Sequence, residues 1–570
     1  MSQTPPPVKH LWRNFWMLLK PFWASKEGKT KGLALLLVVL ALTAGAVYLQ
    51  KVLNTWHNNF YNSIQTYNFP EFKHLLITFC WLAAIWVLVG VHRVYFNQML
   101  QIVWRRWMTK NKIKDWLANN NFYRLQLTDR KTDNPDQRIA EDISEFVSST
   151  LSLSIGFLSE IATLFTFLGV LWTLSKPSTL TIGDHTFALS QGYMVWAALV
   201  YAVFGTVITF WLGRPLVRLN FNQQRNEADF RFSLIRVREN AESIALYKGS
   251  SEEGSHLTER FRHVVDNFYS LMKRQKLLGF FTLGFNQTAV VFPIILGAPL
   301  YFAKQITLGD LMQTLSAFGI VQGSLSILVD SYTDLARWKS VVDRLATFEN
   351  GLKDAEKQPR IEPQYADHQL ALHGLQVQHP AGHTLMSAAN WHLDKGDALL
   401  IQGPSGCGKS TLLRTLAGLW PYASGTVSYP EGAQPLFLSQ KPYLPLGSLR
   451  QVLSYPLEAV DANKASAALN QVGLSQFIER LEDEDNWSHI LSLGEQQRIA
   501  FARILLVKPD VLFLDEATSA LDEDNEQRLY ELVRSELPET IMVSVGHRST
   551  LRPFHKKMLV WQADAHWQLG

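Results

Sequence analysis

Cysteine is scarce in this sequence, because only Cys80 and Cys407 occur among its 570 residues. The first lies in a long apolar segment and the second in a glycine-rich motif far later in the chain. The two thiols are not expected to meet, so a fold held together by disulfides is excluded. Internal repeats and low-complexity tracts are missing as well, and the sequence therefore gives no sign of a repeat architecture.

A strong excess of charge of one sign is also absent, since the formal net charge is only +4. The basic residues gather between long apolar runs, with ten Lys or Arg in 92–150 and twelve in 213–279. The other segments between runs, 51–73, 175–190 and 304–310, carry two, one and one. If the runs cross a membrane, the basic segments and both chain termini are expected in the cytoplasm. The charge therefore needs no nucleic-acid partner.

Long apolar runs are concentrated before residue 331. Five of them have the length of a membrane span, and a sixth is more polar. Their approximate bounds are 32–50, 74–97, 151–174, 191–212, 280–303 and 311–330. The outer segments are too short for an external binding domain, and Thr179–Ser190 alternates around Gly183-Asp184 in the pattern of a small hairpin. We predict an all-α membrane domain of six helices over 32–350.

The first run has an alternative interpretation as the core of a cleaved signal peptide. It is longer than a typical signal core, and its removal would leave five spans and contradict the charge pattern. Leu11–Trp23 precedes it and mixes Trp and Phe with Arg and Lys. This mixture predicts an interfacial helix on the inner leaflet, within a cytoplasmic region 1–31.

Residues after 350 differ in kind, and the segment Gly403–Ser410 reads GPSGCGKS. It follows Ala398–Ile401, an apolar run predicted to be a buried strand, and precedes a predicted helix. Glycines permit a tight turn whose N–H groups surround a phosphate, while Lys409 supplies positive charge and Ser410 a hydroxyl for Mg²⁺. The alternative, a glycine-rich turn without a ligand, is disfavoured by the motifs that follow it.

Val511–Asp522 reads VLFLDEATSALD, a predicted buried strand that ends in two carboxylates. Asp515 is suited to hold Mg²⁺ through water, and Glu516 is the candidate general base for the attacking water. The alternative, that both merely cap the following helix, suits one of them but not both.

Leu491–Arg498 reads LSLGEQQR and predicts a loop followed by a helix. The N-terminus of this helix, with Ser492 and Gly494, is suited to contact a γ-phosphate. Gln440 lies between a predicted strand and a loop, where a polar side chain can sense Mg²⁺ or water.

Together with the isolated His547, these motifs resemble the nucleotide-binding domain of ABC transporters. The resemblance marks the Walker A loop, Gln440 as the Q-loop, Leu491–Gln496 as the signature, Ser519–Asp522 as the D-loop and His547 as the switch histidine. In that family the signature of one subunit closes over the Walker A nucleotide of the other. The resemblance therefore implies a dimer with two ATP sites.

The resemblance also implies which residues form the site. Those expected at the nucleotide are Gly403, Pro404, Ser405, Gly406, Cys407, Gly408, Lys409, Ser410, Thr411, His379, Ser492, Gly494, Glu495 and Asp522. The catalytic residues expected are Glu516, His547 and Gln440, and those expected near Mg²⁺ are Ser410, Gln440 and Asp515. Two positions depart from the family pattern: Leu493 stands where the signature usually has glycine, and His379 where an aromatic residue usually stacks on adenine.

A wider resemblance covers nearly the whole chain. Thr132–Ile143 and Val237–Gly249 look like the coupling segments of exporter-type ABC proteins, although Asn134–Asp136 alone would suit an ordinary turn. The sequences of these two segments, together with LPLGSLR after Gln440, are similar to those of bacterial YddA and SbmA/BacA-like half-transporters and of ABC subfamily D, the peroxisomal fatty-acyl transporter type. The domains expected are the membrane domain, a linker 351–368 and an α/β P-loop ATPase domain 369–570.

This resemblance implies a homodimer that uses ATP to move a solute across the bacterial inner membrane. Peptides, fatty-acyl compounds and cobalamin-like molecules are the substrates that it suggests, and it leaves import or export open. An ATP-dependent membrane regulator or an ATP-gated pore remains an alternative. A soluble ABC protein acting on ribosomes or DNA is excluded by the spans.

Glu160 is the one acidic residue deep inside a predicted span, where an ionised carboxylate is costly unless it faces protein or water. Helical spacing puts it on a small, polar stripe, Ser149, Ser152, Gly156, Glu160, Thr163 and Thr166. Two interpretations remain open. Glu160 either forms a structural hydrogen bond between helices, or lines a substrate cavity where it binds a cationic group or carries a proton.

Overall fold

The computed structural model describes residues 11–128, 134–182, 185–562 and 565–570. The chain divides into two compact units, one formed by 1–118 with 130–352 and the other by 119–129 with 353–570. The first unit is helical apart from one small hairpin, and the second combines sheets with helices.

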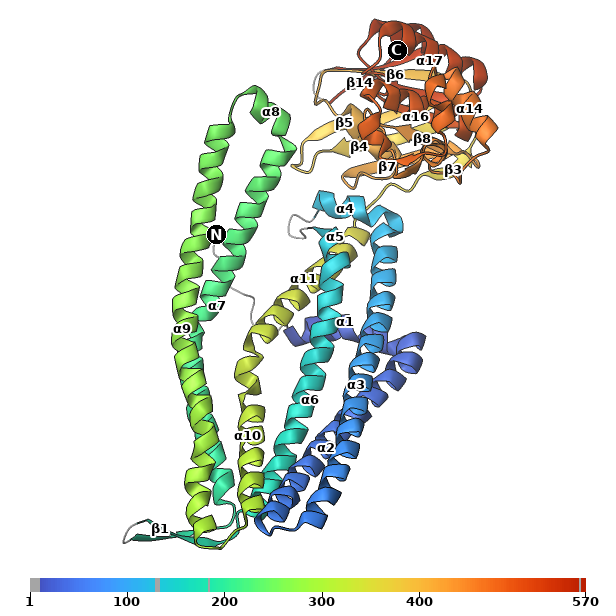
Figure 1. The fold of residues 1–570 in the computed structure, drawn as a ribbon. Coiled ribbons are helices and arrows are strands. Elements are labelled where there is room, and N and C mark those ends of the chain that lie inside the picture. Colours follow the sequence, from blue (N-terminus) through green and yellow to red (C-terminus); the bar gives the residue numbers. More distant parts are fainter. Residues whose placement is uncertain (1–10, 129–133, 183–184, 563–564) are drawn as a thin grey trace. The chain divides into compact units, whose positions relative to one another are not determined.

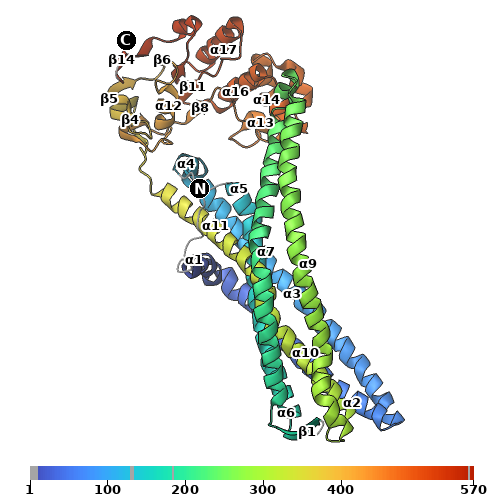
Figure 2. The ribbon, with the colours of Figure 1, turned by 90° about the vertical axis from the view of Figure 1, so that its left-hand side faces the viewer.

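Long helices build the first unit (Figure 1). In chain order they are α1 (Leu11–Ala24), α2 (Leu33–Gln65), α3 (Phe69–Leu117), α6 (Ile143–Leu174), α7 (Tyr193–Glu239), α9 (Ser250–Phe302), α10 (Leu308–Asp330) and most of α11 (Tyr332–Glu356). Helices α7 and α9 run side by side and are joined at one end through α8 (Ala241–Leu246), as both views show (Figures 1 and 2). Helix α10 packs against α2, α6, α7 and α9, and so ties this pair to the other helices.

Five helical stretches among the described residues are long and apolar enough to cross a membrane. They are Gly28–Gln65, Phe69–Leu127, Pro135–Leu174, Tyr193–Glu239 and Ser250–Phe302. They contain the first five expected spans and confirm that most of these helices continue well beyond the apolar run. The sixth expected span, 311–330, lies within α10. Large apolar side chains such as Phe165 and Trp211 are exposed along these helices, as lipid contact requires.

Three smaller expectations concern the ends of these helices. Helix α1 covers the segment expected to be an interfacial helix. The expected outer hairpin is present as β1 (Ser178–Ile182) and β2 (His185–Leu189), which pair antiparallel, while its central Gly183-Asp184 lies outside the described residues. Helix α8 forms in the second expected coupling segment. The first begins outside the described residues and continues as α5 (Pro135–Gln137) and the short π-helical segment η4 (Arg138–Asp142).

Two sheets form the centre of the second unit. The larger contains, in spatial order, β14 (Trp567–Leu569), β13 (Lys557–Trp561), β6 (Ala398–Gln402), β12 (Ile541–Val545), β11 (Val511–Asp515) and β8 (Pro435–Leu438). Its strands are parallel except for β14 at the edge. The smaller contains β3 (Gln364–Asp367), β7 (Ala423–Pro430), β4 (Leu370–Gln378) and β5 (Thr384–Leu393).

The larger sheet is buried on both faces, which explains why its strands are nearly all apolar. Successive residues of β11 alternate between two cores, with Leu512 and Leu514 in one, and Val511 and Phe513 in the other. The predicted strands at 398–401 and 511–514 are thereby confirmed. Because β6, β11 and β12 are parallel, their carboxyl ends meet at one edge of the sheet, where open α/β sheets bind ligands.

Two boundaries differ from the expected ones. Helix α4 (Asn121–Thr128), which was expected to belong to the membrane domain, groups with the second unit. Its Leu125 is buried and its Leu127 packs against the core beneath β4 and β5, so the helix hides its apolar side there. The expected linker 351–368 instead holds the end of α11, which continues because Leu352 and Ala355 are buried, and then β3.

Candidate nucleotide-binding site

The glycine-rich loop 403–408 connects β6 to α12 (Lys409–Leu416) at the ligand-binding edge of the larger sheet. Gly406 and Gly408 have φ of +82° and +106°, a region that side chains other than glycine rarely adopt. Pro404 and Ser405 lie between Gly403 and Gly406, and Cys407 lies between Gly406 and Gly408. Helix α12 begins at Lys409, with Thr411 in its first turn, and directs its positive N-terminal end at the loop.

Lys409 is almost completely buried, and its ammonium group closes the loop. It donates hydrogen bonds to the carbonyl oxygens of Gly403, at 2.8 Å, and of Pro404, at 3.0 Å. These two acceptors are neutral. A phosphate oxygen carries negative charge and makes a stronger, charge-assisted partner, so an incoming phosphate can replace them.

Ser410 and Asp515 are 105 residues apart in sequence and come together at the end of β11. The Ser410 hydroxyl donates to Oδ1 of Asp515 at 3.1 Å. Burial raises the pKa of Asp515, the neighbouring Glu516 carboxylate adds to this, and the Ser410 hydrogen bond opposes it. A half-buried carboxylate with an adjoining hydroxyl is a donor set that fits a hard divalent cation such as Mg²⁺.

Glu516 follows β11 directly and has an unusual backbone conformation. Its φ is +50°, and its N–H donates to the carbonyl of Val545 at 3.1 Å. Such a conformation in a residue other than glycine is sparsely populated and recurs at functional sites. It turns the carboxylate towards His547, whose Nε2 lies 3.6 Å from Oε1 of Glu516. The structure therefore brings together the expected base and the expected switch histidine.

The signature segment Leu491–Gln496 forms the start of α16 (Leu493–Val507) in the predicted loop-to-helix arrangement. Ser492 is the N-cap and makes a reciprocal capping box with Glu495, whose carboxylate accepts from the Ser492 N–H at 2.9 Å and hydroxyl at 2.8 Å. Leu493, in the position usually held by glycine, is 41% exposed. Within the described residues, no hydrogen bond joins Ser492, Gly494 or Glu495 to the loop 403–408 of the same chain.

Gln440 and Asp522 lie on two loops that flank the sheet. The Gln440 side chain is exposed, and its backbone carbonyl accepts a hydrogen bond from Gln497 at 2.9 Å. Asp522 caps α17 (Glu523–Glu536) through the N–H of Asn525 at 2.8 Å, and this bond lowers the pKa of its carboxyl group. Neither side chain contacts the loop 403–408 in the described chain.

His379 lies in the hairpin between β4 and β5, which belongs to the smaller sheet. Its ring stacks on that of His383, with centroids 4.3 Å apart and planes 18° from parallel. Its Nδ1 accepts from the N–H of Ala381 at 3.1 Å. Two stacked imidazoles thus form a flat, exposed platform at the position where the family resemblance implies contact with adenine.

Gln497 is a site residue within the motif Leu491–Arg498 for which the sequence pattern predicted no role. Its side chain is fully buried and joins two loops. Its Nε2 donates to the carbonyl of Gln440 and to the hydroxyl of Ser519, and its Oε1 accepts from the N–H of Ala520. A signal for it was available, because a polar residue on the inward face of a helix with apolar neighbours calls for buried partners.

Glu526, on α17, is a second buried residue that the sequence argument missed. It accepts from the hydroxyls of Thr518 and Thr550, both at 2.6 Å, and lies 3.7 Å from the guanidinium of Arg548. These contacts hold the segment after Glu516 against the segment after His547. They therefore support the pair of residues expected to carry catalysis.

Glu160 belongs to the first unit and is far along the chain from the nucleotide motifs. It lies on α6, where its carboxylate accepts from the hydroxyl of Ser324 on α10 at 2.7 Å. It also lines a cavity between helices. Both features that the sequence left as alternatives, a bond between helices and a place in a cavity, are thus present.

Comparison with known proteins identifies both units. Residues 22–302 match the model of ABC transporter transmembrane region 2, and residues 386–519 match the ABC transporter model. The chain is 40% identical to an uncharacterized ABC transporter ATP-binding protein of Haemophilus influenzae, covering 98% of this chain and 93% of that protein. It is 36% identical to the inner membrane ABC transporter ATP-binding protein YddA of Escherichia coli, over 96% of this chain and 97% of that one.

A more distant relative is the lysosomal cobalamin transporter ABCD4 of Homo sapiens, 28% identical over 97% of this chain and 94% of that protein. All of these relatives match along almost the full chain, so the similarity includes the helices as well as the nucleotide motifs. The chain therefore belongs to the ABC transporter family, with a helical transmembrane region followed by an α/β ATPase domain.

Proposed function

We propose that this chain is one half of an ATP-driven transporter that works as a dimer of identical chains in a bacterial inner membrane. The observation that carries the proposal is the meeting of Lys409, the Ser410–Asp515 pair and the Glu516–His547 pair at one sheet edge of a chain that also holds five candidate spans. The helices provide a path for a solute, and the sheet edge provides the chemistry that drives it.

The residues at the sheet edge have separate tasks in this proposal. ATP bound with Mg²⁺ supplies the phosphoanhydride bond whose hydrolysis releases free energy. Lys409 exchanges its two carbonyl partners for phosphate oxygens, and Ser410 with Asp515 holds the cation. Glu516 takes the proton from the attacking water, and His547 keeps that carboxylate oriented.

A second copy of the chain completes the site. The capped start of α16 exposes Ser492 and Leu493 and has no hydrogen bond to the loop 403–408 within the described chain. The N-terminus of such a helix is able to bind a phosphate, but no hydrogen bond connects it to the phosphate-binding loop of its own described chain. The signature of the partner chain would supply this surface, so that each ATP site uses residues of both chains.

The printed names of relatives suggest membranes and substrates for this chain. YddA is an inner membrane protein, and ABCD4 is a cobalamin transporter. With the basic segments on the inner side, both termini and the ATPase domain face the cytoplasm. Peptides, fatty-acyl compounds and cobalamin-like molecules are the substrate classes to be tried.

The test uses the full-length protein reconstituted in liposomes. Wild type should hydrolyse ATP, and Glu516→Gln should retain ATP binding while its turnover falls roughly 100- to 10,000-fold, because the water loses its base. Glu536→Gln, an exposed carboxylate near the end of α17, is the matched control and should keep normal turnover. Near-normal turnover in Glu516→Gln would refute the assignment of the base.

Net movement of a substrate across the liposome membrane, inwards or outwards, must follow ATP hydrolysis if the chain is a pump. Hydrolysis stimulated by a ligand that never crosses the bilayer would instead indicate a membrane regulator. Conductance that exceeds the rate of turnover would indicate an ATP-gated pore. Either result would overturn the transport proposal.

A further inference from the structure

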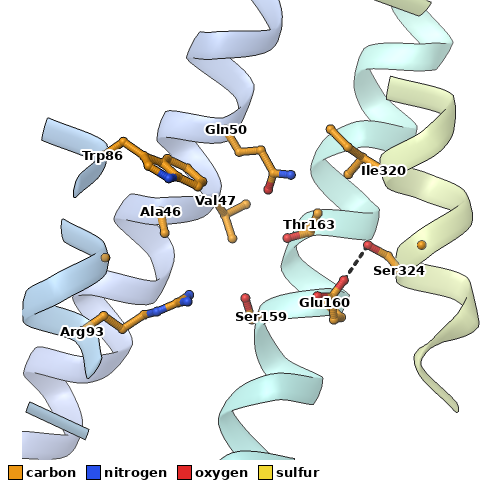
Figure 3. Close-up of a pocket in the computed structure, with 12 residues that line it drawn as sticks. Ala46, Val47, Gln50, Trp86, Arg93, Ser159, Glu160, Thr163, Ile320 and Ser324 are labelled. Atoms are coloured by element: carbon orange, nitrogen blue, oxygen red, sulfur yellow. Dashed lines mark hydrogen bonds between the residues drawn. The ribbon is translucent and has the colours of Figure 1, made fainter. Parts of the chain in front are cut away.

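A cavity of about 510 Å³ lies within the first unit, between α2, α3, α6 and α10. Its lining is mixed, with Gln50 on α2, Trp86 and Arg93 on α3, Glu160 and Thr163 on α6, and Ser324 on α10 (Figure 3). Cavities of a few hundred cubic ångströms with a small number of converging polar groups are typical ligand sites. The sequence pattern pointed to Glu160 but gave no role to Arg93, which lines the cavity opposite it.

The two charged side chains face the cavity from different helices. Figure 3 shows the guanidinium of Arg93 pointing across the gap towards Ser159, whereas Glu160 reaches back to Ser324. In the part of the chain that the structure describes, no ion pair joins Arg93 to Glu160, and Arg93 has no hydrogen-bond partner. The two charges thus lie in one cavity without neutralising each other.

A purely structural role explains the position of Glu160 but not that of Arg93. The bond from Ser324 occupies Oε2 of Glu160 and joins α6 to α10, so the carboxylate has a structural use. Among the described residues Arg93 makes no such bond, and Figure 3 shows its side chain directed into the cavity, towards α6. Arg93 lies near the cytoplasmic end of the expected span 74–97, where an arginine can normally extend to water, so one directed into a cavity instead indicates a ligand or a pathway.

The remaining groups define what kind of ligand fits. A guanidinium binds a carboxylate or a phosphate through paired N–H donors, and the free Oε1 of Glu160 accepts from an ammonium group. Trp86 lies seven residues before Arg93 on the same face of α3 and lines the same cavity, so its indole offers an apolar surface there. A ligand with one charge only would leave the opposite group of the cavity unpaired.

The geometry points to a site for a zwitterionic group, with Arg93 binding its anion, Glu160 binding its ammonium and Trp86 contacting an apolar part of the ligand. This inference rests on the proposed transport function and narrows its substrate to compounds that carry both charges. Two sources offer that chemistry, a soluble compound such as a dipeptide and a phosphatidylethanolamine headgroup.

The experiment measures binding by calorimetry, without ATP, to the full-length protein in nanodiscs made only of phosphatidylglycerol. The soluble probes are leucyl-leucine, its N-acetyl form, which is only anionic, and its amide, which is only cationic. The lipid probes are dihexanoyl phosphatidylethanolamine and dihexanoyl phosphatidylglycerol. In one of the two series the zwitterion should bind at least about tenfold more tightly than its singly charged analogues. Equal affinities within both series would overturn the inference.

Variants then assign each charge. Arg93→Gln should bind the zwitterion no better than the cationic probe, and Glu160→Gln no better than the anionic probe. Arg93→Lys keeps the charge but loses the paired donors, and should therefore keep only part of the preference. Arg218→Gln and Glu239→Gln are the matched controls, because both residues are exposed on α7 outside the cavity, and they should bind as wild type does. A preference that survives in both Arg93→Gln and Glu160→Gln would place the zwitterion elsewhere and refute the site.

Basal ATP hydrolysis is recorded on the same samples, which separates the two proposals. Hydrolysis without any preference for zwitterions would remove this inference and leave the transporter proposal standing. A clear preference in a protein that hydrolyses no ATP would support the site and remove the transporter proposal.

Discussion

The buried side-chain amide of Gln497 donates a hydrogen bond to the backbone carbonyl of Gln440, 57 residues earlier in the chain. The same amide group contacts Ser519 and Ala520. Gln497 therefore connects the loop of Gln440 with the loop that follows Glu516, from a helix that begins at the signature. Any movement of one of these three segments must be accommodated by the other two.

This connection predicts that Gln497→Leu lowers ATP turnover by about tenfold with little change in ATP affinity, because it leaves the Gln440 carbonyl and the Ala520 N–H without partners. ATP hydrolysis and ATP binding by the full-length protein would be measured side by side. Gln471→Leu, an exposed change at the end of α14 (Ala462–Gln471), is the control and should change neither. A loss of affinity as large as the loss of turnover would show that Gln497 acts on binding.

The second prediction concerns assembly. If each site needs the signature of the partner chain and a dimer works only with both sites intact, a wild-type chain paired with a Ser492→Arg chain is inactive. When both chains are produced in equal amounts, activity should fall to about one quarter of the wild-type value, because about a quarter of the dimers carry two intact signatures. Glu484→Arg, an exposed change in the short strand before the signature, serves as the control. Activity of one half would indicate chains that work independently.

The third prediction uses the position of Cys407 in the phosphate-binding loop. A Cys80→Ser variant leaves Cys407 as the only thiol in the chain. A maleimide should then stop ATP hydrolysis, because the added group occupies the loop, and saturating ATP with Mg²⁺ should slow the labelling at least about tenfold. Labelling would be followed by mass spectrometry. Equal rates with and without ATP would contradict a nucleotide at this loop.

The fourth prediction concerns His555, whose ring is buried beside β12. Its Nδ1 lies 2.7 Å from the carbonyl of Leu551 and its Nε2 lies 2.8 Å from the hydroxyl of Ser544. A carbonyl only accepts, so Nδ1 carries the proton and Nε2 accepts from Ser544. Burial lowers the pKa of His555 from 6.5 to about 4, and the hydrogen bond to Leu551 opposes this shift.

As the pH falls below 6.5, His555 becomes protonated in the unfolded chain, whereas in the folded chain it stays neutral until about pH 4. The free energy of unfolding therefore decreases. Between about pH 7 and about pH 5, His555 should lower the free energy of unfolding by roughly 2 kcal/mol. His555→Gln should abolish that part of the acid sensitivity. Thermal unfolding of both proteins in detergent at the two pH values measures the difference. An equal loss in the two proteins would show that another group is responsible.

Local patterns were sufficient to predict the two-part architecture. Apolar length predicts a membrane span whatever surrounds it, since every backbone polar group in lipid must bond within its own helix. The strands at 398–401 and 511–514 were equally predictable, because the short apolar runs are buried on both faces of one sheet. The order of the motifs implied the nucleotide site, because the loop before Ser410 follows β6, Asp515 ends β11, and these parallel strands end at one edge of the sheet.

The sequence by itself therefore determined the family and five of the spans, because each depends on a pattern within short segments. It also predicted which residues lie at the phosphates. Only the tertiary structure decided that α4 packs with the ATPase unit, that Gln497 joins three segments and that Arg93 shares a cavity with Glu160. These relationships join residues from different helices and loops. The side chains on each face of one helix can be predicted from its period, but their partners depend on how the helices pack.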